Sequence, residues 1–164
     1  MNRRSIAAAI GIAAFAAVGL FAFQGTVGKA AADDLQAVVD SRRALMKDNV
    51  AKMKAMGDVV EAKSGDLAAM QQLAEGLQAN AMKIPDDFPK GTSMSDMPGK
   101  TNAKPEIWDS FDDFKAIAVT FATESGKLAD AAKSGDMVAF AAQYDVVGEK
   151  ACGGCHTKYR MKQQ

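Results

Sequence analysis

Apolar residues recur every three or four positions over most of the chain, which is the spacing of one face of an α-helix. The first such stripe contains no proline and predicts a helix over residues 33–63. It is followed by Ser64-Gly65, where the glycine can end a helix in the left-handed conformation, and by Asp66, which can cap a second helix over 66–82. The first half of the chain therefore predicts a helical hairpin.

A second pair of apolar stripes predicts helices over about 105–133 and 136–160. The sequence Ala-Lys-Ser-Gly-Asp occurs at 62–66 and again at 132–136, so we expect the same tight turn in both hairpins. All four prolines lie within 85–105 and predict one long connection. Period-two runs of β-branched residues are absent, and we therefore predict an all-α, antiparallel four-helix bundle.

The N-terminus has the features of an export signal. Arg3 and Arg4 precede 18 residues, Ile6 to Phe23, that are built only of Ala, Gly, Ile, Val, Leu and Phe, and Ala30-Ala31-Ala32 offers a small-residue cleavage site. We expect residues 1–32 to be a signal peptide and 33–164 to be the mature, periplasmic bundle. An uncleaved membrane anchor is the alternative, because 18 residues are about the minimum for a membrane-spanning helix.

Charge argues against nucleic acid as a partner. The chain has 20 basic and 20 acidic residues, without the excess of Lys and Arg that phosphate binding requires. Removing 1–32 would remove three basic residues and no acidic one, leaving 17 against 20 and a net charge of −3.

Both cysteines and the one histidine lie within five residues, Cys152-Gly153-Gly154-Cys155-His156. This is the attachment pattern of a c-type haem, in which two thiols form thioethers and the adjacent imidazole binds the iron. On a helix the three side chains fall within about 100° of one face. The alternatives are a thiol–disulfide redox site, a structural disulfide and a zinc site that would have to recruit two carboxylates.

Several segments together resemble the class II cytochromes c, the cytochrome c′ family: Ser41–Asn49, Lys104–Trp108, Asp113–Lys115, Ser134–Asp136 and Cys152–Arg160. They cover essentially the whole mature chain. The resemblance implies a four-helix bundle with one covalent haem c between its helices and His156 as proximal iron ligand. Relatives of this kind often form dimers through their first two helices, so a homodimer is a further hypothesis.

The resemblance also implies a distal residue. In the family, the residue one turn after the arginine of the first helix points at the distal haem face, and here Met46 follows Arg42 by four positions. The low-spin branch of the family places its ligating methionine in a segment similar to Leu45–Asn49. Met46 is therefore expected as the sixth iron ligand, with a gap-filling core methionine as the alternative.

Three further residues are candidates for contact with the haem. Arg42 and Arg160 are candidates to bind the haem propionates, because a guanidinium group binds a carboxylate through two hydrogen bonds. The alternative is that each is a solvated charge on the protein surface. Trp108 either packs on the haem edge or fills the core. The acidic residues Asp109, Asp112 and Asp113 are expected on a solvated helix face.

These features predict a non-enzymatic, exported electron carrier with His156 and Met46 as axial ligands and with unidentified redox partner proteins. The main alternative is a five-coordinate, high-spin cytochrome c′ that binds nitric oxide or carbon monoxide at an open distal site. A haem-free thiol redox protein is the third hypothesis.

Overall fold

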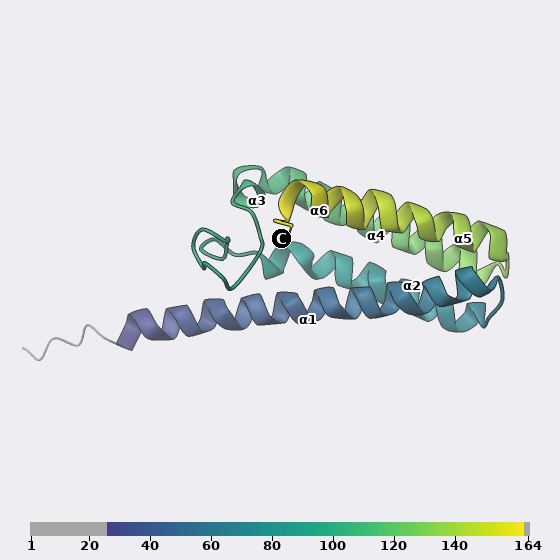
Figure 1. Ribbon diagram of the computed structural model, residues 1–164, viewed down its shortest axis with the longest axis horizontal. Coiled ribbons are helices and arrows are strands. Elements are labelled where there is room, and N and C mark those ends of the chain that lie inside the picture. Colours follow the sequence, from purple (N-terminus) through teal and green to yellow (C-terminus); the bar gives the residue numbers. More distant parts are fainter. Residues whose placement is uncertain (1–25, 163–164) are drawn as a thin grey trace, which may run out of the picture.

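The computed structural model describes residues 26–162, which form a bundle of antiparallel helical rods (Figure 1). Most of the predicted signal peptide, residues 1–25, lies outside the described residues, so its cleavage stays a prediction. None of the helices within 26–162 is both long and apolar enough to cross a membrane.

The first hairpin joins α1 (Thr26–Ala62) to α2 (Leu67–Lys83). The cap is as predicted, since the Asp66 carboxylate accepts hydrogen bonds from Ala68 N at 2.9 Å and Ala69 N at 3.1 Å. The first helix ends at Ala62, one residue before the predicted end. The left-handed residue after it is Lys63, with φ 51°, and not Gly65 as predicted, whose φ is 156°. The helix therefore stops directly after Ala62.

The second hairpin is more segmented than the sequence predicts. The expected helix over 105–133 is divided at Ser110 into α3 (Glu106–Asp109) and α4 (Phe111–Lys133). The expected helix over 136–160 consists of α5 (Met137–Val146), a π-helix η2 (Val147–Gly153) and α6 (Gly154–Tyr159). Here the turn is as predicted, with Gly135 at φ 75° and the carboxylate of Asp136 bonded to the first amides of α5.

The centre of the bundle is the packing of α2 against α4, the most extensive contact between two of its helices. Both helices bury alanines, which let their backbones approach closely, and the larger side chains around them close the core. The buried alanines are Ala74 and Ala81 of α2 and Ala118, Ala122, Ala129 and Ala132 of α4. Leu77, Phe114 and Leu128 are among the fully buried side chains between the layers.

The long connection between the hairpins contains a short 3-10 helix, η1 (Ile84–Asp87), and ends beside the C-terminus. Ala103 and Arg160 form an isolated antiparallel bridge, and Lys104 N donates to Tyr159 O at 3.0 Å. Figure 1 shows this loop, α3 and α6 together at one end of the molecule. The segment that carries the two cysteines and the histidine therefore ends against the loop.

Candidate functional site

The Cys-His motif spans the junction of η2 and α6. Cys152 belongs to the π-helix, and Cys155 and His156 lie in the first turn of α6. Both cysteines are partly buried against the core, and neither forms a disulfide. A π-helical turn inside a longer helix is uncommon and occurs often at functional sites.

The two glycines of the motif leave room beside the backbone. A Cβ added at Gly154 would meet no other atom within 4 Å, and one added at Gly153 would lie 3.4 Å from the carbonyl oxygen of Gly148. A flat ring attached through Cys152 and Cys155 can therefore approach α6 closely at Gly154. The donor set and this open backbone fit a covalently attached haem.

The protonation states of the motif also suit this role. Burial raises the pKa of Cys152, and burial followed by the neighbouring Cys152 raises the pKa of Cys155 to about 11. Partial desolvation and then the charge of Arg160 lower the pKa of His156. At neutral pH the cysteines are thiols and the imidazole is neutral, which is the form that binds a metal.

The same pKa shifts oppose the haem-free hypotheses. A redox-active dithiol needs an easily formed thiolate, and here burial disfavours it at both cysteines. Among the described residues, no three His, Cys, Asp or Glu side chains come close enough together to hold a metal ion. The recruited carboxylates that a zinc site requires are therefore missing from the motif's surroundings.

The register between α1 and the last rod determines which part of α1 lies opposite the motif. A Cβ added at Gly57 would lie 2.6 Å from Tyr144 Oη, and one added at Gly148 would lie 3.9 Å from Met53 Cε. Moving four residues back along α1, from Gly57 to Met53, thus corresponds to moving four residues forward along the last rod, from Tyr144 in α5 to Gly148 in η2. The rods run in opposite directions, as Figure 1 also shows.

Extending this register by seven residues, about 10 Å along α1, predicts that Met46 lies near the level of Cys155. Met46 is half-buried and packs against the same core as Cys152 and Cys155. Its predicted role as iron ligand stays a prediction, and so do the roles of the two cysteines and His156.

Arg42 is buried, and its guanidinium already has partners in the long loop. Nε donates to Asp87 O at 2.9 Å, and the two terminal nitrogens donate to Thr92 Oγ1 at 2.6 Å and Thr92 O at 3.3 Å. The group also lies over the Phe88 ring, 3.8 Å from its centroid. Desolvation lowers the pKa of Arg42 to about 10, so it stays charged at neutral pH. Arg42 thus holds the loop against α1, a role that the sequence did not indicate.

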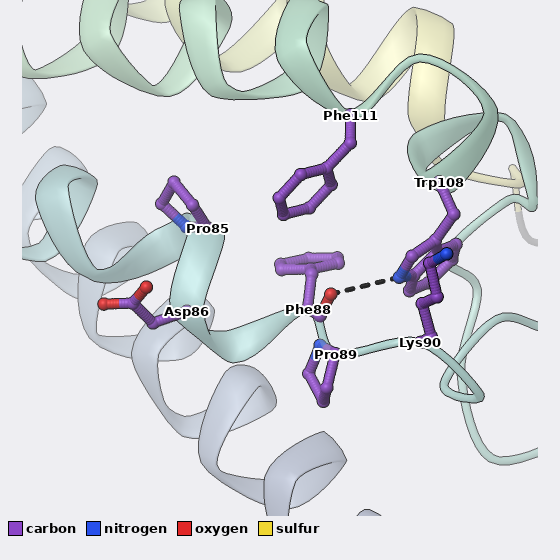
Figure 2. A pocket seen from close by; sticks show the side chains of 7 residues that line it. All are labelled: Pro85, Asp86, Phe88, Pro89, Lys90, Trp108 and Phe111. Atoms are coloured by element: carbon purple, nitrogen blue, oxygen red, sulfur yellow. Dashed lines mark hydrogen bonds between the residues drawn. The ribbon is translucent and has the colours of Figure 1, made fainter.

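Arg160 and Trp108 belong to different segments, since Arg160 directly follows α6 and Trp108 lies in α3. Arg160 is exposed at the end of α6, four residues after His156. Trp108 is half-buried, donates from Nε1 to Phe88 O at 3.0 Å and lines an open groove of about 430 Å³, together with Phe88, Phe111 and two prolines (Figure 2). Contact of Arg42, Arg160 or Trp108 with a haem stays a prediction.

A further anchor of α6 was missed because Asp113 was expected on a solvated face. The Asp113 carboxylate accepts hydrogen bonds from Tyr159 Oη at 2.6 Å and from Lys158 Nζ at 2.8 Å. Tyr159 is buried and packs edge-on against Phe114. Nothing local in the sequence indicates this contact, because Asp113 lies 46 residues before Tyr159.

Residues 37–160 match the family model described as Cytochrome C′. The chain belongs to the cytochrome c′ family. Among its relatives is cytochrome c-556 from Agrobacterium fabrum, 33% identical over 76% of this chain and 81% of the relative. The chain is therefore a c-type cytochrome of class II, and its cofactor is covalent haem c.

Solved structures of cytochromes c′ share the fold. One, described by its ligand-controlled dimer dissociation, is 26% identical and has a TM-score of 0.71, with 78% of this chain and 97% of that chain covered. A nitric oxide complex of a cytochrome c′ variant from Alcaligenes xylosoxidans is 28% identical, with a TM-score of 0.69 and coverage of 79% and 97%. Cytochromes c′ of known structure thus include a dimer and a nitric oxide complex. These likenesses favour the gas-binding alternative over the predicted electron carrier with two protein ligands.

Proposed function

We propose that the mature chain is an exported, periplasmic haem c protein in which Cys152 and Cys155 form the thioethers and His156 is the proximal iron ligand. The observation that carries this assignment is the placement of all three residues at the η2–α6 junction, beside the open backbone at Gly154. The lowered pKa of His156 supports it, because a neutral imidazole is the form that binds iron.

The chain's own residues then have separate tasks. The core of α2 and α4 and the Tyr159–Asp113 hydrogen bond hold α6 in place. The extended α1–α5 register predicts Met46 near the level of the motif. The haem iron supplies one-electron redox chemistry and the binding site for a diatomic ligand. Burial of its surroundings by apolar side chains limits access of water and tunes the potential.

The proposed function is binding of nitric oxide or carbon monoxide at an open distal face, without an enzymatic turnover. The nitric oxide complex of a cytochrome c′ with this fold supports this assignment. Met46 is then an apolar wall of the distal pocket. A homodimer is proposed along with it, because a structurally similar cytochrome c′ is described by its dimer dissociation.

One-electron transfer with Met46 as sixth ligand is the second candidate. The register of α1 against α5 and η2 favours it, because Met46 comes to the level of Cys155 and carries a thioether, an established haem ligand. With both axial positions filled, the iron would change oxidation state with little rearrangement, and redox partner proteins would take the place of the gas.

Optical spectra of the ferric protein, and of the ferrous protein with and without carbon monoxide, separate the two functions. Gas binding predicts a high-spin ferric spectrum and ready carbon monoxide binding, both unchanged by the volume-conserving substitution Met46→Leu. Electron transfer predicts a low-spin spectrum with a weak red sulfur-to-iron band, and Met46→Leu then makes the iron high-spin and open to the gas. Met53→Leu, on the same helix, is the matched control. A low-spin spectrum that survives Met46→Leu contradicts both candidates.

A further inference from the structure

The first long helix, α1, buries one amide side chain, that of Asn49. It is 7% exposed, although asparagine is a residue type that mostly lies on protein surfaces. Around the axis of α1 it lies about 60° from Met46 and about 40° from Met53, which contacts η2 near Gly148. On its other side, Asn80 of α2 bonds to its amide. Asn49 therefore lies on the interior face of α1, between α2 and the last rod.

The hydrogen bonds around Asn49 determine which way its amide points. Asn80 Nδ2 donates to Asp48 Oδ2 at 2.6 Å and to Asn49 Oδ1 at 2.8 Å. Hydrogen bonds from Lys52 and then from Asn80 lower the pKa of Asp48, so this group is a carboxylate at neutral pH and can only accept. Asn80 must therefore present its NH2 group to Asp48. Asn49 must in turn present its oxygen to Asn80.

This arrangement leaves the NH2 group of Asn49 without an acceptor. Within residues 26–162, Asn49 Nδ2 donates no hydrogen bond, although the side chain is almost fully enclosed. Native proteins rarely bury a donor without a partner, because removing it from water is costly. A link between α1 and α2 alone does not explain the group, since Asp48 and Asn80 already join the two helices. The free donor points to a ligand.

The register of α1 predicts where this donor lies relative to the haem motif. Met53 of α1 lies beside Gly148 of η2. Moving four residues along each rod, about 6 Å on α1, predicts that Asn49 lies near the level of Cys152. Met46, the proposed wall of the distal pocket, is one turn further along the same face of α1. The free donor is therefore expected on the side of the haem that Met46 lines.

We infer that Asn49 is a specificity-determining residue of the distal site, whose Nδ2 donates a hydrogen bond to a diatomic ligand on the haem iron. The inference rests on the proposed gas-binding function. The donors and the steric access of a distal pocket decide which diatomic ligands a haem holds. A donor stabilises a bound ligand whose outer atom carries negative charge, and bound nitric oxide accepts such a bond better than carbon monoxide. Asn49 thus favours nitric oxide over carbon monoxide.

The infrared C–O stretching band of the ferrous carbon monoxide complex reports this contact directly, because a hydrogen bond to the ligand lowers the frequency. Asn49→Leu and the smaller Asn49→Val both remove the donor and should shift the band to higher frequency. Dissociation of nitric oxide should also become about two- to tenfold faster relative to dissociation of carbon monoxide, the range that one hydrogen bond supplies.

Asn80→Leu is the matched control, because it removes the other partner of the same hydrogen bond and leaves the Asn49 donor in place. Its band should stay at the lower frequency. In denaturant unfolding of the ligand-free ferric protein, Asn80→Leu should lose more stability than Asn49→Leu, since it leaves the buried Asn49 oxygen unpaired whereas Asn80 is half-exposed. A band that stays in place in both Asn49 variants, or that moves equally in Asn80→Leu, overturns the inference.

Failure of the proposed function is distinguishable from failure of this inference. If the ferrous wild-type protein binds no carbon monoxide, gas binding at an open site is wrong, and the comparison moves to the Met46→Leu protein. A higher frequency after adding Asn49→Leu to Met46→Leu supports the donor, and an equal frequency overturns it. Absence of carbon monoxide binding in both backgrounds overturns the function and the inference together.

Discussion

Replacing Arg42 by methionine should release the long loop from α1. The substitution keeps an apolar stem on the helix but removes the guanidinium that bonds Asp87 O and Thr92 O and that lies over Phe88. Thr92 is fully buried, so its carbonyl cannot turn to solvent without movement of the loop.

The expected loss can be assembled from these contacts. Leaving the two carbonyl oxygens without a donor costs about 1–3 kcal/mol each, and the lost cation–π contact adds about 2 kcal/mol. The wild-type protein pays a desolvation cost for the buried Arg42 charge, which also lowers the pKa of Arg42 to about 10. Methionine removes this cost, and the gain offsets part of the lost stability. We expect a net loss of about 2–4 kcal/mol in the free energy of unfolding.

Denaturant unfolding of the haem-loaded protein, followed by circular dichroism, measures this loss, and limited trypsin cleavage after Lys90 or Lys100 reports release of the loop. Lys54→Met is the matched control. Its exposed side chain pairs with Asp58, which also lies on α1, at 3.2 Å, and such surface pairs contribute about 0–1 kcal/mol. An Arg42→Met protein with unchanged stability and an uncleaved loop would refute the reasoning.

Two further predictions test the contacts around the motif. Gly57→Ala should not give the usual helix-interior gain of about 1 kcal/mol, because the new Cβ would lie 2.6 Å from Tyr144 Oη and 3.3 Å from Tyr144 Cζ. In a Tyr144→Leu background, which removes both atoms, the gain should return, and a double-mutant cycle without coupling would disprove the α1–α5 register. Hydrogen bonds from Lys158 and Tyr159 hold the pKa of Asp113 below its ordinary value of 3.8. Asp113→Asn should therefore destabilise the fold at neutral pH, and its difference from wild type should shrink as the pH falls below 3.8 and vanish below the lower folded-state pKa. Unfolding curves across this pH range, with Asp112→Asn as control, check the sign; a difference that grows on acidification contradicts it.

The parts of the fold that depend on local signals could be predicted from the sequence. Asp66 and Asp136 cap α2 and α5 because a carboxylate two and three residues before free amides needs no tertiary partner. The Cys-His motif is equally local, since its spacing alone defines the attachment chemistry.

What the sequence could not show depends on distant contacts. The helices are interrupted at Ser110 and by the π-helix η2. The three- and four-residue spacing of apolar residues continues through both places, so the spacing does not reveal the interruptions. The partners of Arg42 lie 45 to 50 residues away, and nothing near Arg42 distinguishes a buried guanidinium from an exposed one. The two copies of the five-residue repeat turn differently. α1 ends at Ala62, the first residue of its copy, and Lys63 is left-handed, whereas α4 ends at Lys133, the second residue of its copy, and Gly135 is left-handed.

The most direct test of the account is the covalent state of the Cys-His motif. Trypsin cleavage after Lys150 and Lys158 releases the peptide 151–158, which contains both cysteines and His156. From the exported protein, after acid–acetone extraction, this peptide should carry the mass of one haem and absorb visible light. An unmodified peptide, or one whose cysteines are joined only to each other, would contradict covalent haem attachment at Cys152 and Cys155.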